Sequence, residues 1–468
     1  MPLRIATNQT TTGITYNLGT LDNLYVPVRV SSVSTGDNSV LGSGGGHKVV
    51  VSGNLFGAHI GIELGSAQTD SGNSVLVNAG GSVDGFDNGI NLSAKNGRIT
   101  NHGSISSVGS AIVVGGELNT TDKIVIANFG TIAGYNGIFF ASGTGVINNF
   151  GVISSDPNNT AIFTDAGDDI VRNHGNIAGT VRLFSGNDKL INRGTIVGDV
   201  KLEANNDVLD NRGGLIDGQI DMGSGDDRFR PGSNADFADG GAGIDTLDFS
   251  DAGSIKVALD GSFAFTGVAI GDSYAQFENI LGSRTETNTL VGDENDNALI
   301  GGGDKDTLSG LGGADRLISG FGNDILLGGS EDDLLNGGDG ADRLTGGSGE
   351  DTLTGGGGAD LFLFGPGDFS GITRNTSDYI ADFSRASGDK INLAAVDAKA
   401  GTATNDAFTF IGTAAFQNVA GELRISFVET SPGFFDTLIL GDTNGDGTAD
   451  FGITLASQIT LLATDFVL

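Results

Sequence analysis

Between Gly292 and Leu363 an apolar residue returns at every ninth position, each time two residues after an acidic or amide residue. The apolar positions are Leu299, Leu308, Leu317, Leu326, Leu335, Leu344, Leu353 and Phe362. The acidic or amide positions are Asn297, Asp306, Asp315, Asp324, Asp333, Asp342, Asp351 and Asp360. A fixed period of this kind predicts a solenoid, here with three residues of strand and six of turn in each unit. We expect two units to complete one flattened coil, with like strands stacked at roughly 4.8 Å and the leucines pointing inward.

Glycine crowds the first four places of each unit, most fully at Gly337, Gly338 and Gly340 and at Gly346, Gly347 and Gly349. Glycine permits positive φ and lets carbonyl groups come close to a bound ion. Carboxylates and carbonyls between stacked turns suit calcium, which takes 6–8 oxygen ligands in irregular geometry. A flexible glycine-rich linker has no reason to repeat leucine at the same step. The sequence therefore predicts several calcium ions in a β-roll spanning residues 292–365.

Residues 1–221 follow a looser repeat, in which Asn-x-Gly recurs every 19 to 27 residues before an apolar strand and a Gly/Asp turn. The motif begins at Asn78, Asn101, Asn128, Asn149, Asn173, Asn192 and Asn211. Asparagine tolerates left-handed backbone and hydrogen-bonds locally, so stacked asparagines can mark one corner of every coil. We expect Ile105, Ile132, Ile153, Ile177, Ile196 and Ile216 to fill the interior of a parallel β-helix. No 3.6-residue apolar stripe supports helices instead.

The segment 222–291 joins these two repeats. Asp227 and Asp245 end the isolated calcium-type units Gly225-Asp226-Asp227 and Gly240-Gly241-Ala242-Gly243-Ile244-Asp245, and we predict both as metal ligands. Residues 251–291 are expected to be a strand-rich spacer within the same solenoid. The whole chain is therefore predicted to be all-β, with a β-helix, a calcium-filled parallel β-roll and a β-rich cap.

The nonapeptide pattern resembles the repeats-in-toxin (RTX) family of secreted bacterial proteins, which form a parallel β-roll filled with calcium. The resemblance implies that the repeat aspartates are side-chain ligands and that backbone oxygens of the glycine turns complete each shell. Some units depart from the pattern. Asn297 replaces the acid, Asp304 and Glu331 replace the fourth-position glycine, and Ser319 opens a unit without glycine.

Residues 366–468 contain Asp378-Tyr379-Ile380-Ala381-Asp382-Phe383 and Gly388-Asp389-Lys390-Ile391-Asn392-Leu393, which resemble the C-terminal domain of the serralysin metalloproteases. A loop in this segment places oxygen side chains as an EF-hand does, at Asp442, Asn444, Asp446 and Asp450. Ile453 stands where an EF-hand has its bidentate Glu. An ion site and an Asx-rich turn are both open readings of this loop.

Zinc protease activity is excluded by the histidines, because His47, His59, His102 and His174 form no H-E-x-x-H motif. Polysaccharide lyase or epimerase activity is the alternative function, with acids and bases on an exposed face of the β-helix. The candidate residues for it are Asp87, Asp165, Asp168, Asp169 and Arg172. Carbohydrate grooves usually display stacking aromatics, whereas this chain has no Trp. An autotransporter passenger is disfavoured, since it needs a C-terminal membrane barrel with aromatic girdles.

Charge and targeting features complete the prediction. The net charge of −34 comes without a basic stripe, which disfavours a nucleic-acid partner. No standard signal peptide or 18-residue apolar stretch is visible, so no transmembrane segment is expected. The end of the chain, Asp465-Phe466-Val467-Leu468, resembles the C-terminal signal read by type I exporters. We predict a secreted, extracellular, non-catalytic protein with a structural, adhesion or matrix role and a cell-surface glycan or matrix as partner.

Overall fold

The computed structural model describes residues 2–19, 22–65, 70–116, 118–401 and 404–468. Within these ranges the regular secondary structure consists of β-strands and two 3-10 turns, at Gly267–Ala269 and Ala463–Asp465. It divides into two compact units, residues 1–246 with 271–277 and residues 247–270 with 278–468. In the described part, no helix combines the length and the apolar character that crossing a membrane requires. The predicted all-β solenoid is confirmed.

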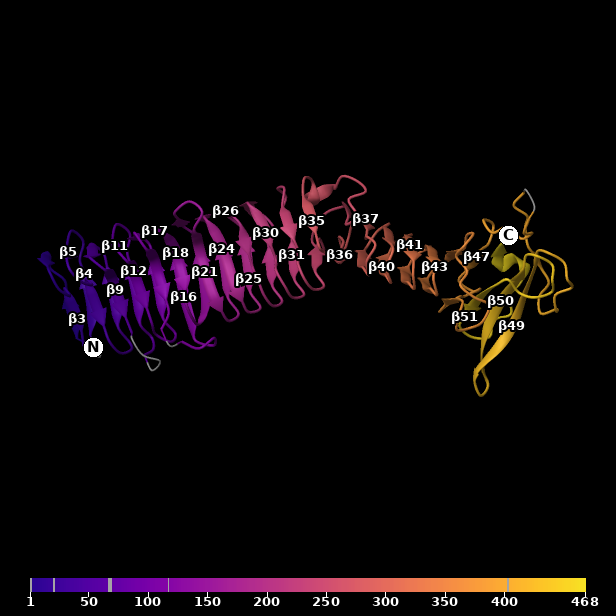
Figure 1. Cartoon of the computed structure of the whole chain (residues 1–468), viewed down its shortest axis with the longest axis horizontal. Helices are drawn as coiled ribbons and strands as arrows, with labels where there is room; N and C mark the ends of the chain where they lie inside the picture. Colours follow the sequence, from indigo (N-terminus) through magenta and orange to yellow (C-terminus); the bar gives the residue numbers. More distant parts are fainter. Residues whose placement is uncertain (1, 20–21, 66–69, 117, 402–403) are drawn as a thin grey trace. The chain divides into compact units, whose positions relative to one another are not determined.

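The first unit is a parallel β-helix with three strands in each coil (Figure 1). One coil consists of β10 (Ser74–Val77), β11 (Ser82–Gly85) and β12 (Asn88–Leu92). These strands pair in parallel with the strands of the next coil, which are β13 (Arg98–Asn101), β14 (Ser104–Ser107) and β15 (Ser110–Val114). The same three-strand order then continues along the unit, so that each coil covers the one before it.

The interior of the β-helix is apolar, as the sequence predicts. Ile105, Ile132, Ile153, Ile177 and Ile196 are fully buried, and the strands of one sheet hold them in register with Ile216. Burying an aliphatic side chain of this size contributes roughly 1.5–3 kcal/mol. Because side chains alternate across a strand, the residue on either side of each isoleucine faces away from the interior.

The Asn-x-Gly motifs form a buried asparagine ladder at one corner of the coils. In each step the Nδ2 group donates to Oδ1 of the next asparagine at 2.8 Å, from Asn101 through Asn128, Asn149, Asn173 and Asn192 to Asn211. The Oδ1 atom of Asn101 also accepts the N–H of Gly103, two residues later, at 3.1 Å, and the next four asparagines repeat this contact. Both the asparagine and the glycine of the motif therefore take part in hydrogen bonds at this corner. The predicted stack of asparagines is confirmed for these six residues.

Asn78 is the exception. The register pairs Asn101 with Val77, and Asn78 instead donates to Ser52 Oγ at 2.8 Å. The prediction that Asn78 belongs to the stack was wrong by one residue, because the interior position of that coil is taken by valine.

The second unit contains the roll, with two strands in each coil (Figure 1). One sheet contains β37 (Asn288–Val291), β39 (Thr307–Leu311), β41 (Ile325–Ser330), β43 (Arg343–Ser348) and β45 (Leu361–Leu363). The other contains β38 (Ala298–Gly302), β40 (Arg316–Phe321), β42 (Leu334–Asp339) and β44 (Thr352–Gly357). Parallel pairing matches residues eighteen apart, such as Leu308 with Leu326 and Leu317 with Leu335. All eight predicted apolar positions are fully buried.

The segment expected to be a spacer is shared between the units. Strand β34 (Ile255–Ala258) pairs with β37 of the roll. Strand β35 (Ser273–Ala275) pairs with β32 (Phe237–Asp239) of the β-helix. Local strand pattern cannot show this, since it says nothing about the partner of a strand.

The C-terminal segment closes the roll. Strands β46 (Asp378–Ile380) and β47 (Lys390–Asn392) add one more strand to each sheet of the roll. Strand β51 (Phe451–Leu455) pairs with β46 and belongs to an antiparallel set with β49 (Glu422–Ser431) and β50 (Phe434–Asp442). Strand β52 (Phe466–Val467) pairs with β47.

Candidate calcium sites in the roll

Each turn of the roll places one aspartate directly before a strand, and coil stacking arranges these residues as two aspartate columns. One column contains Asp306, Asp324, Asp342 and Asp360, and the other contains Asp315, Asp333 and Asp351. In five of these seven aspartates the backbone N–H donates to Oδ1 of the aspartate eighteen residues later, at 2.7 to 3.0 Å. Asp351 and Asp360 donate in the same way to Asp378 and Asp389 in the cap. One carboxylate oxygen per turn is therefore used in joining consecutive coils.

The second carboxylate oxygen, Oδ2, has no hydrogen-bond partner in the described part of the chain at any of these seven aspartates. These aspartates are at most 3% exposed, so bulk solvent does not reach the Oδ2 atoms to hydrogen-bond with them. A buried polar atom without a partner costs free energy, and a buried charge costs more. These oxygens are consequently the strongest indication that the turns hold a ligand.

The pKa values agree with that indication. Burial, with further contributions from neighbouring carboxylates, raises the pKa of Asp333 to about 8 and those of Asp306 and Asp315 to about 7. For Asp342, Asp351 and Asp360 the same causes raise the pKa to about 6. Charged carboxylates in this arrangement repel one another, and a divalent cation between turns would remove that repulsion.

The donor set fits calcium. Carboxylate and carbonyl oxygens are hard ligands, and stacked turns offer both without a rigid geometry. In the described ranges no cluster of three or more His, Cys, Asp and Glu side chains meets at one point. An ion between two turns would accordingly combine aspartate oxygens with backbone carbonyls of the glycine positions.

The glycines are required for steric reasons that the structure makes specific. A Cβ atom on Gly337 or Gly346 would overlap Oδ2 of Asp342 or Asp351, five residues later. A Cβ atom on Gly338 or Gly347 would overlap the carbonyl oxygen of Gly320 or Gly329 in the preceding coil. Gly340 and Gly349 lie over the carbonyl oxygens of Gly322 and Glu331. The glycines at the second and fourth places of these two units also have positive φ, between 94 and 151°. They are Gly338, Gly340, Gly347 and Gly349.

This geometry agrees with a match of the sequence to a known family. Residues 291–326 and 327–362 match the family model described as RTX calcium-binding nonapeptide repeat (4 copies). The roll is a block of RTX calcium-binding repeats. Repeats of this family bind calcium, which is the ion that the unpartnered oxygens of the two aspartate columns favour.

Comparison with individual proteins adds little to the RTX assignment. Among the solved structures that match is the AlgE6R3 subunit of the Azotobacter vinelandii mannuronan C5-epimerase, which is 24% identical. The match covers 38% of this chain and 80% of that chain, and the TM-score of 0.24 carries no argument about activity. No curated protein matches the chain.

The irregular units of the RTX roll keep the conformation of the turn. Asp304 and Glu331, which replace the fourth-position glycine, have φ of 61° and 77°. Ser319 is fully buried and donates through Oγ to the carbonyl of Gly337 at 2.7 Å. Asn297 holds the place of the acid in its column, where its N–H donates to Asp315 Oδ1 at 2.8 Å. The sequence departures therefore change individual ligands and leave the backbone of the turn intact.

Asp227 and Asp245, the two predicted ligands outside the tandem block, lie in the β-helix unit. The N–H of Asp227 donates to Oδ1 of Asp245 at 2.8 Å, which is the contact that joins aspartates in the RTX roll. Their role as ligands stays a prediction.

The loop after β50 differs from the RTX roll, because its side chains satisfy one another. Asp442 accepts the N–H groups of Gly445 and Gly447 at 2.7 and 2.9 Å. Asn444 accepts the N–H of Asp446 and donates to Asp450, and Asp446 accepts the N–H of Thr448, each at 2.8 Å. These are the contacts of an Asx-rich turn, and a bound ion at this loop stays a prediction.

The residues considered for polysaccharide chemistry do not gather into one site. Asp87 pairs with His59 at 2.8 Å between the second and third strands of its coil. Asp168 and Asp169 lie at the corner between β21 (Thr160–Ala166), which contains Asp165, and β22 (Ile170–Asn173), which contains Arg172. There Asp168 accepts the N–H of Asn187 at 2.9 Å, and Asp169 is 1% exposed.

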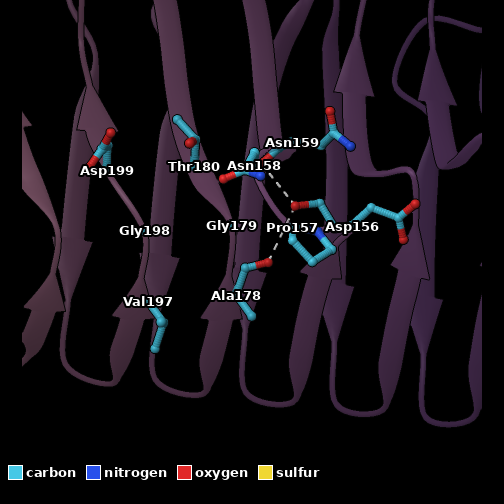
Figure 2. A pocket seen from close by; sticks show the side chains of 11 residues that line it. Asp156, Pro157, Asn158, Asn159, Ala178, Gly179, Thr180, Val197, Gly198 and Asp199 are labelled. Carbon is cyan, nitrogen blue, oxygen red and sulfur yellow. Dashed lines mark hydrogen bonds between the residues drawn. The ribbon is translucent and has the colours of Figure 1, made fainter.

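A groove of about 510 Å³ lies elsewhere on the β-helix, where the loop Asp156–Asn159 projects beside two shorter turns (Figure 2). Ser155 and the turns at Ala178–Thr180 and Val197–Asp199 form the rest of its lining. None of the acids considered for catalysis lines it.

The middle residues of the Asn-x-Gly motifs form an external stack of rings. His102, Phe129, Phe150 and His174 lie with ring centroids 4.7 to 5.1 Å apart and planes within 6° of parallel. Each ring face is covered by the neighbouring ring, so a sugar could contact mainly the ring edges along this row. His102 and His174 are thus turn residues stacked on phenylalanines, and between its two ends the stack leaves no open ring face for a sugar.

Proposed function

We propose that calcium ions between the turns of the RTX roll neutralise the two aspartate columns, and that this neutralisation folds the second unit. The proposal is carried by one observation, the buried and unpartnered Oδ2 atom in every aspartate of the two columns. Apart from calcium, no ligand is needed to explain it. The chain as a whole is then a calcium-dependent structural protein without catalytic activity.

The place of action follows from the affinity expected of such sites. Extracellular calcium modules bind at roughly 10⁻⁴–10⁻³ M, far above calcium levels inside cells. Metal-binding free energy contributes directly to folding when the site does not exist in the unfolded chain. We therefore propose that the chain leaves the cell unfolded through a type I exporter and that residues 292–365 fold outside.

The remaining segments receive roles in the same proposal. Residues 1–221 provide a rigid surface for adhesion to a cell-surface glycan or matrix, and residues 222–291 connect that surface to the roll. Residues 366–468 close the roll as a serralysin-like cap. The last four residues serve as the export signal before folding. Afterwards Phe466 and Val467 form β52, and Asp465, at the end of the preceding 3-10 turn, accepts from Arg385 Nε at 2.6 Å.

A calcium titration of the purified chain tests the central point. Circular dichroism should show a cooperative gain of β signal, and equilibrium dialysis should count several ions per chain. Asp351→Asn should lower the count, whereas Glu350→Gln, an exposed neighbour with the same loss of charge, should not. A chain that is fully folded in chelator and binds no calcium would overturn the proposal.

Export is tested separately in a host with a type I exporter. Removal of residues 465–468 should retain the protein inside the cell, and moving these residues onto an unfolded passenger should support its export. Normal secretion of the shortened chain would contradict the assigned signal and leave the calcium proposal intact.

A further inference from the structure

The β-helix contains an aspartate column of its own, outside the residues that match the RTX family. Asp188, Asp207 and Asp227 each stand directly before the first strand of a coil, at β25 (Lys189–Asn192), β28 (Val208–Asp210) and β31 (Arg228–Arg230). The N–H of Asp188 donates to Asp207 Oδ1, and that of Asp207 to Asp227 Oδ1, both at 2.7 Å. The contact is the one that joins aspartates in the roll, although a coil here has three strands instead of two.

The turns before Asp207 and Asp227 have the backbone of an RTX turn, whereas before Asp188 only Gly186, two residues earlier, has positive φ, at 139°. In the roll, the residues four and two before Asp342 have φ of 94° and 151°. The corresponding values are 105° and 131° before Asp227, at Gly223 and Gly225. Before Asp207 they are 73° and 80°, and the residues are Glu203 and Asn205. Positive φ strains a residue such as glutamate, so the conformation is kept here against the preference of the sequence.

Hydrogen bonds between successive turns are also the same in the roll and in this part of the β-helix. Gly340 donates its N–H to the carbonyl of Gly357 in the roll at 2.6 Å, and Gly225 donates in the same way to Ala242 at 2.8 Å. The residue before each aspartate repeats a second contact. Glu350 N–H donates to Asp332 Oδ1 at 2.7 Å in the roll, and Asp226 N–H donates to Asn206 Oδ1 at 3.0 Å in the β-helix.

The carboxylates of this column carry the same unpartnered atom as those of the roll. Asp188, Asp207 and Asp227 are each 1% exposed, and in the described ranges Oδ2 of each has no hydrogen-bond partner. A proton on Oδ2 would be a buried donor with no acceptor, whereas a cation would use the oxygen directly. This buried oxygen is an observation independent of the turn conformation.

One position distinguishes the two kinds of turn. The first glycine of the nonapeptide, five residues before the aspartate, is replaced by Leu202 and Met222, both fully buried in the β-helix. Those side chains fill the wider interior of a three-strand coil. The nonapeptide pattern is thereby broken in sequence while the turn itself is retained.

We infer that the corner of the β-helix at Asp188, Asp207 and Asp227 binds a row of calcium ions, which lie between successive coils. The ligands are the Oδ2 atoms and carbonyl oxygens of the turns, a hard all-oxygen set suited to calcium. The inference rests on the proposed calcium function of the roll and extends it into the first unit. Calcium then orders both the unit that folds on export and the surface that meets the partner.

The test counts calcium in the full-length chain. Equilibrium dialysis against calcium, with atomic emission as readout, compares the wild type with Asp207→Asn and with Asp351→Asn in the roll. Asparagine keeps the Oδ1 acceptor and removes the anionic oxygen. Each substitution is expected to remove one or two ions per chain, because one carboxylate borders two gaps between coils. Asp217→Asn, an exposed change on the coil of Asp207, should remove none.

Hydrogen exchange locates the effect and covers variants that fold poorly. In saturating calcium, peptides spanning 202–228 should exchange at least tenfold faster in Asp207→Asn than in Asp217→Asn, while peptides of the roll remain unchanged. An ion count unaltered by Asp207→Asn but lowered by Asp351→Asn would overturn this inference alone. A wild-type chain that binds no calcium would overturn both this inference and the proposed function.

Discussion

The backbone N–H of Asp333 donates to Oδ1 of Asp351 at 2.9 Å, eighteen residues further along the chain. Each aspartate of the two columns thus contacts its neighbour through one oxygen, and within the described ranges its other oxygen has no hydrogen-bond partner. Because one oxygen joins the coils and the other is left for an ion, the same carboxylates couple the stacking of coils to calcium binding.

Removal of calcium should unfold the second unit. Without cations, the buried carboxylates repel one another, so EGTA should abolish most of the β signal of the second unit, residues 247–270 and 278–468. Circular dichroism with limited proteolysis would measure the loss, and added calcium should reverse it. A spectrum unchanged by EGTA would contradict the prediction.

The effect of pH should depend on calcium. In EGTA, the folded-state pKa values of about 6 to 8 for Asp342, Asp315 and Asp333 exceed the unfolded value of about 3.9. The folded state then binds more protons, so the free energy of unfolding falls as pH rises from about 5 to 8. With calcium bound, protons compete with the ion and stability should rise with pH. In EGTA, circular dichroism should show β signal returning as pH falls from about 8 to 5. In calcium, denaturant titration over the same range should show stability rising with pH, which is the opposite trend.

Substitution of a turn glycine should destabilise the roll by steric overlap. In Gly346→Ala the new Cβ would meet Asp351 Oδ2, and overpacking of this kind costs roughly 1–3 kcal/mol. Gly253→Ala is the matched control in the same unit, because its Cβ would have no neighbour within 4 Å. Denaturant titration in saturating calcium would measure both. Equal stability of the two variants would contradict the assigned contact.

The asparagine ladder should be costly to interrupt. The Asn149 side chain accepts from Asn128 and Gly151 and donates to Asn173 and to the carbonyl of Asn176, so Asn149→Ala removes four hydrogen bonds at this corner. We expect a loss of about 3 kcal/mol in the free energy of unfolding of the β-helix. Asn148→Ala changes the adjacent residue, which points away from the interior, and should cost less than about 0.5 kcal/mol. Thermal and denaturant unfolding of the two variants would measure both losses, and equal losses would contradict the assigned role of the ladder.

The sequence predicted the roll more completely than the β-helix, for a physical reason. Eight units of constant length allow only one register, so the buried leucines and the columns at Asp315 and Asp342 could be assigned directly. Coils of the β-helix vary in length, and the motif alone could not show that Val77, instead of Asn78, takes the interior place.

The column at Asp188 and Asp207 was missed because its turns lack the first glycine of the nonapeptide. A search for an acid followed two residues later by a buried apolar residue, at steps of 18 to 20, would have found it at Leu190, Leu209 and Phe229. The division of residues 251–291 between two units could not be predicted, since strand pairing over such distances depends on tertiary packing.

The constant contact between aspartates eighteen residues apart has a consequence for how the length of the roll can change. Insertion or removal of eighteen residues returns every donor to an equivalent acceptor, whereas a change of nine exchanges the two columns and moves the strands to opposite sheets. At the C-terminal end, Asp378 and Asp389 accept from Asp351 and Asp360 at 3.0 and 3.1 Å, although longer segments separate them in sequence. The cap therefore reproduces the contacts of a next coil. Rolls of different length, altered in whole coils, could share this cap without a new interface.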